Sequence, residues 1–484
     1  MDEQQLVNGN DTVIEQCASE QDVLDRDVIV ALDAAPFNVE LHRAVAVVHR
    51  RQGHVLEALA HVAAADVLTA VGHDTASAAP AVCQLATGFF MKQDYPVALW
   101  WYQLVLLLDP NHAVAYLNLV VIYLHSGRIA EAEQCRERAY QLQRIFINSA
   151  SNMLSVSSDP QRHPRQLLIL CVGRSAGNIP YEVLLSGGCS DRITYIIDYA
   201  AVAEDVHLPK FDMVFNAIGD ADVAAPLSMR LAAFEQSCRV PVLNAPARVA
   251  ATGRNNLMRL VEGVAGVVVA PCVLLTGGGS VAERELLLER VLAQPDMLFP
   301  LLIRPVASHG GQGLVCCADS DELRAYLQIF LREGEGAFYL TRFINTADAH
   351  GFYRKYRVIY IDRQPYPYHM AITTEWMVHY ISAKMEEDDW KIEEERAFLQ
   401  DPAATLGAQA IAALMAIGNC MDLDYVGIDF TLLADGRILI FEANATMLVH
   451  RVRANGVLAY KNAYVEHIVA AFEQMLIKHE STHL

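Results

Sequence analysis

Two carboxylates near the C-terminal end of the sequence have a spacing that suits metal binding. Asp429 and Glu442 lie in two apolar runs that flank Asp435-Gly436, and Asp-Gly between apolar runs predicts a two-residue hairpin turn. Counting outward from this turn places Asp429 directly opposite Glu442, with Cβ atoms about 5 Å apart. Asn444 lies two residues beyond Glu442 and therefore points to the same face.

These three side chains offer oxygen atoms that suit a hard cation. Like charges that face each other across two strands repel, and a cation between them would remove that cost. Two carboxylates and an amide oxygen suit Mg²⁺ that carries nucleotide phosphates. The alternative is an exposed hairpin with acidic residues on its surface, which the apolar neighbours of both carboxylates disfavour. We therefore predict that Asp429, Glu442 and Asn444 bind Mg²⁺.

The segment IRPVASHGGQG at 303–313 has the composition of a phosphate-binding loop. Its glycines would let the backbone approach phosphates, and the backbone N–H groups would donate hydrogen bonds to them. Arg304, on the strand before the loop, could contact phosphate oxygens with two parallel hydrogen bonds. A plain turn is the alternative. The predicted loop residues are Ser308, His309, Gly310, Gly311, Gln312 and Gly313.

Overall composition narrows the class of protein. The 484 residues predict two to four domains, and 53% apolar against 19% charged residues allow large cores. A net charge of −20 argues against a general nucleic-acid or membrane-surface binder, because phosphate groups would be repelled. The sequence predicts neither a signal peptide nor a membrane span. Ten scattered cysteines without a CxxC pair predict reduced thiols in a cytoplasmic protein.

The first third of the sequence is helical and repetitive. Ala98 and Ala132 occupy equivalent positions in successive copies, and an earlier, looser copy begins near Pro36, displaced by an insertion of six residues near 66–80. A helix–turn–helix unit of about 34 residues resembles the tetratricopeptide repeat. The resemblance covers the sequence from about 17 to 145, and an ordinary helical bundle is the alternative. Stacked repeats would offer a surface for a peptide or protein partner, or for a second copy of the chain in a homodimer.

The rest of the sequence predicts a linker followed by two kinds of α and β arrangement. Residues 146–166 are rich in Ser, Asn and Pro, as linkers are. Strands then alternate with helices, which predicts a small parallel sheet with strands at 166–172, 193–198, 211–218 and 241–244. From about 268 the pattern becomes α+β, with strands at 301–306, 338–344, 353–362 and 367–373 and helices at 320–332, 403–421 and 460–479. The charged run at 385–396 predicts a solvated helix or a flexible flap.

The order of these segments resembles the ATP-grasp superfamily over about residues 166–480. The parallel-sheet region is followed by NAPARVAATGRNNL, by IRPVASHGGQG, by central strands, and by the closing GIDF…FEANA hairpin. The resemblance implies two α+β subdomains that clamp ATP, activate a carboxylate as an acyl phosphate and couple it to an amine or thiol. The predicted fold is therefore multidomain: an all-α helical repeat domain at 1–150, an α/β domain that precedes the ATP-grasp domain at 163–260, and an α+β ATP-grasp domain at 261–484.

The resemblance also assigns roles to particular cations. Arg304 occupies the position of a family lysine over the α- and β-phosphates, and Arg254, in TGRNN, replaces a second lysine. An arginine can bind phosphate, but its planar fork needs a different fit. Arg357 matches the strand cation that orients the transferred phosphate or the acyl group. The hinge that contacts adenine would be Thr341, Arg342, Phe343 and Ile344, in which Arg342 replaces a common acidic residue.

The segment HMAITTEWMVHY at 369–380 is an unusual insert, close to the strands that would form the floor of the site. It predicts a role in acceptor binding or in stabilising the acyl phosphate, with His369 as a second catalytic candidate beside Arg357. The alternative is a core tryptophan with satisfied histidines.

We therefore expect a ligase that depends on ATP and Mg²⁺ and joins a small-molecule or peptide carboxylate to an amine or thiol. Two other functions stay open. One is a repeat scaffold with a degenerate, non-catalytic nucleotide-binding domain, which the replaced lysines favour. The other is a phosphotransferase on the same fold.

Overall fold

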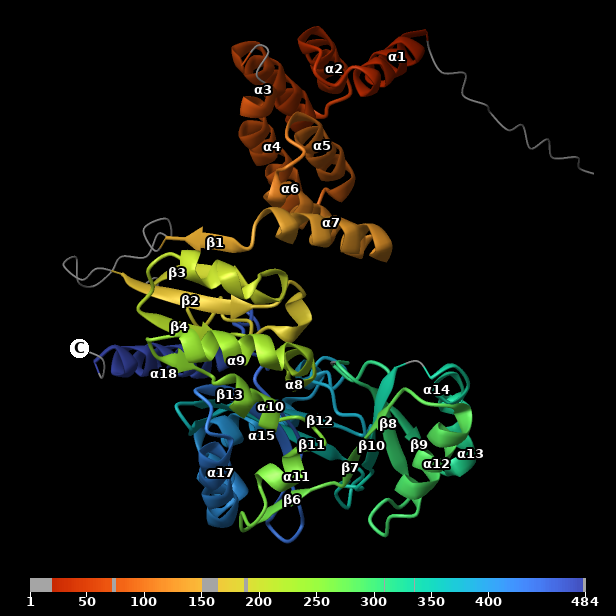
Figure 1. Ribbon diagram of the computed structural model, residues 1–484, viewed down its shortest axis with the longest axis vertical. Helices are drawn as coiled ribbons and strands as arrows, with labels where there is room; N and C mark the ends of the chain where they lie inside the picture. The colour runs from red at the N-terminus through yellow and green to blue at the C-terminus, as the bar shows by residue number, and fades with distance from the viewer. Residues whose placement is uncertain are drawn as a thin grey trace, which may run out of the picture. The chain divides into compact units, whose positions relative to one another are not determined.

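The computed structural model describes residues 20–71, 75–149, 164–186, 190–308, 310–334 and 336–481. These residues form two compact units that divide after Gln143 (Figure 1). His309 and most of the predicted linker, from 150 to 163, lie outside the described residues. None of the described helices is long and apolar enough to cross a membrane.

The first unit consists of consecutive helix pairs whose spacing follows the predicted repeat. The pairs are α2 (Val39–Arg51) with α3 (Val55–Val71), α4 (Ala79–Met91) with α5 (Tyr95–Leu108), and α6 (Ala113–His125) with α7 (Ile129–Leu142), preceded by α1 (Glu20–Ala34). Counted in residues, the distance from the start of α4 to the start of α6 equals the distance from the start of α5 to the start of α7. The distance from the start of α2 to the start of α4 is longer. The additional residues fall near the 3-10 helix Thr75–Ala78, as predicted. The helical region and its period are confirmed, and the tetratricopeptide assignment stays a prediction.

A buried pair of histidines lies in this unit. His42 and His61 are 0% and 6% exposed, and their Nδ1 atoms are 3.0 Å apart. His42 Nε2 lies 2.9 Å from the carbonyl oxygen of Pro36, to which it donates, so His42 Nδ1 accepts from the Nδ1–H of His61. This contact excludes protonation of both rings at once, because two Nδ1–H groups would then face each other. Burial first, and then the charges of His42 and His49, lower the pKa of His61 to about 3.

Acid should therefore destabilise the helical unit. An unfolded histidine takes up a proton near pH 6.5, whereas folded His61 stays neutral down to about pH 3. Its contribution to stability is complete above pH 6.5 and is lost as the pH falls towards 3. We expect the free energy of unfolding to drop by about 2 kcal/mol between pH 7 and pH 5 for each histidine that stays neutral. Urea unfolding of the full chain at both pH values checks this. His61→Gln should weaken the pH dependence, and His125→Gln, at an exposed position of α6, should leave it unchanged.

The second unit begins with a sheet in the order β1-β3-β2-β4-β5. The strands β2 (Arg165–Cys171), β3 (Ser190–Ile196), β4 (Met213–Asn216) and β5 (Val242–Leu243) are parallel, which confirms the predicted parallel sheet. Helix α9 (Ser228–Ser237) packs on this sheet through Leu231 and Phe234. β1 (Ile145–Asn148) pairs antiparallel with β3. The linker prediction was therefore wrong at 146–148, where apolar residues with strand propensity complete the edge of the sheet.

Two further sheets follow. One has the order β7-β10-β8-β9 and consists of β7 (Cys272–Thr276), β10 (Ala337–Arg342), β8 (Leu301–Pro305) and β9 (Val315–Cys317). Its core includes residues of α12 (Val281–Leu292), α13 (Ser320–Tyr326) and α14 (Gln328–Glu333). The other has the order β12-β11-β13-β14-β6 and consists of β12 (Gln364–Thr373), β11 (Tyr353–Ile361), β13 (Tyr425–Leu432), β14 (Ile438–Asn444) and β6 (Val267–Val269).

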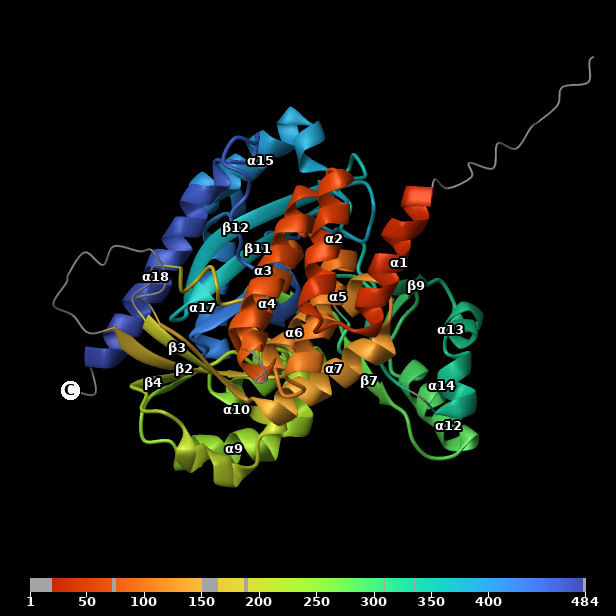
Figure 2. The same ribbon diagram turned by 90° about the horizontal axis from the view of Figure 1, so that it is seen from above.

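Three helices contact the sheet that carries the predicted metal ligands. They are α15 (Asp389–Gln400), α17 (Ala408–Met421) and α18 (Lys461–Ser481), and α16 (Pro402–Leu406) connects the first two (Figure 2). The charged run at 385–396 forms most of α15. The prediction of a solvated helix or flap was only partly right, because α15 buries Ile392, Glu395 and Phe398.

One asparagine fastens the first sheet of this unit to the third. Asn244 follows β5 in a left-handed conformation, with φ of 54°, and is fully buried. Its Oδ1 accepts from the backbone N–H groups of Asp424 and Tyr425 at 2.9 and 2.8 Å, and its Nδ2 donates to the Tyr425 carbonyl at 2.9 Å. The Asn244 side chain thus supplies hydrogen bonds that a neighbouring strand would otherwise make. The predicted boundary at 260–261 falls inside this compact unit.

Candidate active site

The hairpin of β13 and β14 places Asp429 opposite Glu442, although its turn differs from the predicted one. The N–H of Leu433 donates to the Arg437 carbonyl at 2.8 Å, so the loop has three residues and not two, with Gly436 at a φ of 81°. A bulge next to Asp429 leaves Phe441 without an opposite residue. The longer turn shifts the register by one residue, and the bulge shifts it back. The predicted turn was wrong, and the predicted pairing is confirmed.

A row of polar residues crosses four strands of this sheet. Arg357 on β11 lies opposite His369 on β12 and opposite Asp429 on β13, and Asp429 lies opposite Glu442 on β14. Directly opposite residues point to the same face, so the strand register brings these side chains to one face of the sheet. Lys355, two residues before Arg357, shares that face.

Asp429 is buried and holds two cations. Its carboxylate accepts from Arg357 Nε and Nη2 at 2.6 and 2.9 Å and lies 3.0 Å from Lys355 Nζ. Burial alone would raise the pKa of the Asp429 carboxyl, but the charges of Arg357 and Lys355 outweigh it and hold that pKa well below its ordinary value. Arg354, on the other face of β11, pairs with Glu394 instead.

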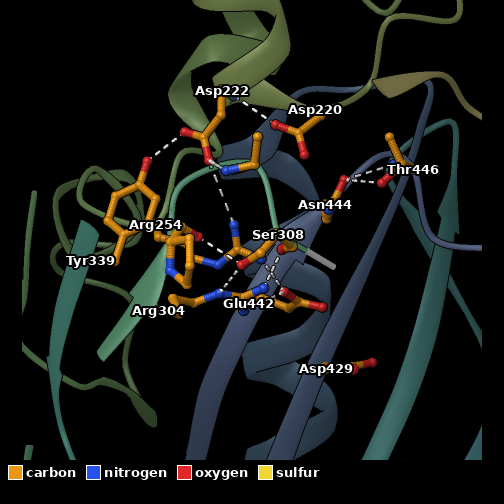
Figure 3. A network of polar contacts seen from close by, with 12 residues as sticks. Asp220, Asp222, Arg254, Arg304, Ser308, Tyr339, Asp429, Glu442, Asn444 and Thr446 are labelled. Carbon is orange, nitrogen blue, oxygen red and sulfur yellow. Dashed lines mark hydrogen bonds and ion pairs between the residues drawn. The ribbon is translucent and has the colours of Figure 1, made fainter. Parts of the chain in front are cut away.

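Glu442 holds two more cations on its side of the hairpin. Arg254, which lies between α10 (Pro246–Ala251) and α11 (Leu257–Leu260), donates to Glu442 at 2.7 Å, and Arg304 Nη1 lies 4.0 Å from it (Figure 3). Arg304 also donates to Ser308 Oγ at 3.2 Å and to the Ser308 carbonyl, which fixes the start of the glycine-rich loop. The expected repulsion between the two carboxylates is therefore offset by the protein's own cations, so a metal is not needed to relieve it.

The donor set still suits a metal that arrives with phosphates. Asn444 lies on β14 beyond Glu442, and its Oδ1 accepts two hydrogen bonds from Thr446, both at 2.8 Å. Within the residues that the structure describes, no group of three or more His, Cys, Asp or Glu side chains is poised to hold a metal. Mg²⁺ usually needs one or two protein carboxylates and completes its shell with phosphate oxygens and water. The oxygens of Asp429 and Glu442 fit that kind of site and not a cage made by the protein alone.

A cavity of about 250 Å³ lies between the second and third sheets of this unit. Its charged lining consists of Arg254, Arg304, Arg342, Lys355, Arg357, Asp429 and Glu442. Its apolar lining consists of Leu257, Val269, Ala270, Cys272, Leu302, Leu314, Phe343, Ile344, Trp376, Met377, Val378, Leu439, Ile440 and Phe441. Four consecutive residues of β14, from Leu439 to Glu442, line the cavity, and the bulge at Phe441 lies among them.

The predicted hinge forms part of this lining. Thr341 to Ile344 all line the cavity, and Thr341 Oγ1 donates to Cys272 Sγ at 3.2 Å. The backbone N–H groups of Arg342 and Phe343 donate to the carbonyls of Pro271 and Pro300, both at 3.0 Å. The hinge is therefore fastened to the chain segments on both sides of it.

The glycine-rich loop contributes two residues to the cavity. Gly310 and Gly311 line it, with φ of 60° and 80°, values that only glycine adopts readily. A Cβ at Gly313 would lie 2.9 Å from Pro305 Cδ, so the loop is too tight there for a side chain. Gln312 is not part of the lining. The predicted contact of these residues with phosphates stays a prediction.

The 374–384 segment, which follows β12, lies against the glycine-rich loop at the edge of the cavity. Trp376, Met377, Val378 and His379 line the cavity, and Met377 Sδ lies 3.1 Å from where a Cβ at Gly311 would be. This segment comes from the predicted insert. The structure places His369 apart from the lining, buried, with its ring 4.7 Å from that of Tyr380. Burial, and then the charges of Arg357 and Lys461, hold the pKa of His369 well below its ordinary value. This placement suits support of Arg357 and not contact with a ligand.

A buried ion pair between two helices contacts the 374–384 segment. Glu395 on α15 and Lys461 on α18 are 0% and 4% exposed, and Lys461 Nζ lies 3.1 Å from Glu395 Oε1. Lys461 also donates to Tyr380 OH at 2.7 Å, within the segment. Glu395 accepts further hydrogen bonds from Tyr460 OH at 2.5 Å and from the Met370 N–H at 3.0 Å. The ion pair therefore connects two helices, β12 and the segment that covers the cavity.

Sequence reasoning missed Asp222 as a residue of the site. It lies in α8 (Ala221–Ala224), accepts from Tyr339 OH at 2.5 Å and from the Ala307 N–H at 3.2 Å, and lies 3.9 Å from Arg254 Nη1 (Figure 3). Asp222 thus links α8, which follows β4 of the first sheet, to the start of the glycine-rich loop. Asp220, two residues earlier in the chain, caps α8 with its side chain. The position of both residues after β4 was the only available signal.

Comparisons with known proteins find remote likeness only. No protein-family model matches the sequence, and no curated protein matches it significantly. Among solved structures, the D-alanine–D-alanine ligase of Bacillus anthracis is 12% identical, with a TM-score of 0.38 over 66% of this chain and 98% of that one. The VanG D-Ala:D-Ser ligase of Enterococcus faecalis is 16% identical, with a TM-score of 0.39 over 64% and 100% of the two chains. The ADP complex of N5-carboxyaminoimidazole ribonucleotide synthetase is 15% identical, with a TM-score of 0.38 over 59% and 71%. With likenesses this remote, the residues of the cavity decide what function is proposed.

Proposed function

We propose that the cavity binds ATP with Mg²⁺ and that the protein is a ligase of the ATP-grasp type. One observation carries this proposal: a single cavity combines an extended apolar lining with five cations and two apposed carboxylates, in a chain whose net charge is −20. A concentration of cations against the overall charge favours a polyanionic ligand. The apolar lining suits a nucleobase, and the paired carboxylates suit the metal that accompanies phosphates.

Each part of the nucleotide has a matching part of the cavity. We propose that the base lies against Phe441 and the hinge residues Phe343 and Ile344. Arg304 and Arg254 would bind phosphate oxygens, and Gly310 and Gly311 would let the loop backbone approach them. Asp429, Glu442 and Asn444 would hold Mg²⁺, which when bound neutralises charge that develops on the transferred phosphoryl group.

The proposed reaction has two steps. A substrate carboxylate oxygen attacks the γ-phosphorus of ATP, forms the acyl phosphate and releases ADP. An amine or thiol then attacks the acyl carbon and releases inorganic phosphate, while its proton passes to solvent or to a neighbouring base. Arg357 and Lys355 are placed to orient the anionic groups of both steps. The 374–384 segment, with His379 in the lining, would exclude water from the acyl phosphate.

A non-catalytic nucleotide-binding protein is the second candidate. The observation that favours it is that arginines occupy both family lysine positions and that both are engaged with Glu442. Release of phosphate from ATP that depends on both a carboxylate and an amine or thiol would support the ligase. Nucleotide binding without phosphate release, across a panel of such substrates, would support the second candidate.

Nucleotide affinity should depend on the cation at position 304. A charge-assisted hydrogen bond contributes about 1.5–3 kcal/mol, so Arg304→Ala should weaken binding by roughly 10- to 150-fold. Arg304→Lys should weaken it less, because it keeps the charge. Calorimetric titration with a non-hydrolysable ATP analogue and Mg²⁺ measures both. Arg354→Ala is the matched control, since Arg354 lies on the same sheet but pairs with Glu394 and Asp348 outside the cavity. Equal affinity of wild type and Arg304→Ala would contradict the assignment.

A further inference from the structure

The groups that would bind the metal and those that would bind phosphates are paired with one another in this structure. Asp429 is held by Arg357 and Lys355, at 2.6 and 3.0 Å. Glu442 is held by Arg254 at 2.7 Å, with Arg304 at 4.0 Å. Arg357, Lys355, Arg254 and Arg304 are all mostly buried, with side-chain exposures between 13% and 18%. Water therefore competes weakly for these charges, and each ion pair must be opened before a ligand can take its place.

Neither ligand finds a favourable site when it arrives alone. A divalent cation that approaches Asp429 and Glu442 meets four cations, which outnumber the carboxylates even when Asp222, 3.9 Å from Arg254, is counted with these two. A nucleotide that approaches without metal needs the same four cations. They are engaged with carboxylates, and those carboxylates would repel its phosphates. Together, the two ligands supply a partner for every group: metal for the carboxylates and phosphates for the cations.

We propose that metal and nucleotide bind this cavity by exchanging ion pairs, so that each is bound weakly without the other. This inference rests on the proposed function, and it concerns the regulation of the same site. The carboxylates then have two roles. They hold the metal in the loaded state, and they block the phosphate-binding cations in the empty state. Because coupling between two ligands is reciprocal, metal strengthens nucleotide binding by the same factor by which nucleotide strengthens metal binding.

The blocking role gives an unusual expectation for Glu442→Gln. Removing this carboxylate should leave Arg254 with only its longer contact to Asp222, at 3.9 Å, and should release Arg304 from its ion pair, so the variant should bind nucleotide in the absence of metal more tightly than wild type does, by about tenfold. The same variant should lose most of the increase in affinity that Mg²⁺ confers. A carboxylate that only held metal would leave metal-free affinity unchanged. Glu442 suits this test because its side chain is 25% exposed, whereas that of Asp429 is 3% exposed.

The experiment is calorimetric titration of the full chain under three conditions. Wild type is titrated with Mg²⁺ alone, with a non-hydrolysable ATP analogue in EDTA, and with the analogue in Mg²⁺. We expect the analogue to bind at least about tenfold more tightly with Mg²⁺ than in EDTA, and Mg²⁺ alone to bind weakly. Glu442→Gln is titrated with the analogue in EDTA and in Mg²⁺. Glu394→Gln is the matched control, because it removes one of the two carboxylate partners of Arg354 on the opposite face of β11, and it should behave like wild type.

Three results would overturn the proposal while leaving nucleotide binding intact. They are equal affinity of wild type for the analogue with and without Mg²⁺, tight binding of Mg²⁺ alone, and no gain in metal-free affinity in a folded Glu442→Gln. If Glu442→Gln fails to fold, the wild-type comparison alone still decides the coupling. Absence of binding under every condition, in wild type and variant alike, would instead contradict the proposed function.

Discussion

Asp429→Asn should destabilise the protein by about 3–5 kcal/mol, in addition to abolishing metal-dependent turnover. The carboxylate is buried and its two oxygens hold Arg357 and Lys355, so the amide leaves two buried cations without a charge partner. The sign of this effect is the opposite of what repulsion between Asp429 and Glu442 alone would predict. Urea unfolding without metal measures the loss of stability, and phosphate release measures turnover.

A matched substitution in the same hairpin provides the control for this prediction. Asp435 lies at the exposed hairpin tip, where it pairs with Arg437 at 2.7 Å. Asp435→Asn should therefore change the free energy of unfolding by no more than about 0.5 kcal/mol. Wild-type stability of Asp429→Asn would mean that its ion pairs are not formed in solution.

Lys461→Met should have an effect of similar size at a second buried ion pair, on α18. It leaves Glu395, which is 0% exposed, as an uncompensated buried charge, and the expected loss of stability is about 3–5 kcal/mol. Because Tyr380 also loses its hydrogen bond from Lys461, the 374–384 segment should loosen and nucleotide affinity should fall. Thermal and urea unfolding, with calorimetric titration, measure both effects.

Two further variants separate charge from packing at this site. The double variant Lys461→Met with Glu395→Gln removes both charges and should recover a large part of the lost stability, since replacing both partners of a buried pair costs far less than replacing one. Lys478→Met removes a lysine of the same helix that is 63% exposed and pairs with Asp362. It should be nearly neutral. A double variant as unstable as Lys461→Met alone would show that the aliphatic packing of Lys461 matters more than its charge.

The parts of the fold that follow local periodicity were predictable from the sequence. The repeat of the first unit, including the insertion of six residues, appears as recurring positions such as Ala98 and Ala132, and both are fully buried. The parallel strands are continuous apolar runs, as strands covered on both faces must be. The charged run at 385–396 was harder, because a helix with two buried charged residues, Lys391 and Glu395, can have the same composition as a solvated one.

The candidate site was only partly predictable, because its contacts depend on strand pairing. Asp429 and Glu442 belong to one hairpin, so local counting could pair them, and it succeeded only because the bulge at Phe441 offset an error in the turn. The cations that hold them come from positions 254, 304, 355 and 357. Only the pairing of β11 with β13, and the path of the chain between the sheets, bring them together. Asp222 reaches the site in the same way, through α8.

Asn244 limits where this chain can be divided. Its side chain takes the place of a strand beside Asp424 and Tyr425, because β14 stops pairing at Gly427 and leaves that edge of β13 open, while β11 pairs with the opposite edge. A fragment that begins after residue 260 would expose two N–H groups and a carbonyl that are buried in the intact protein, and such an unpaired edge can recruit strands from other molecules. Protein engineers who wish to exchange the second and third sheets between related proteins should therefore carry the segment around Asn244 with them, although it lies 180 residues earlier in the chain than the strand it completes.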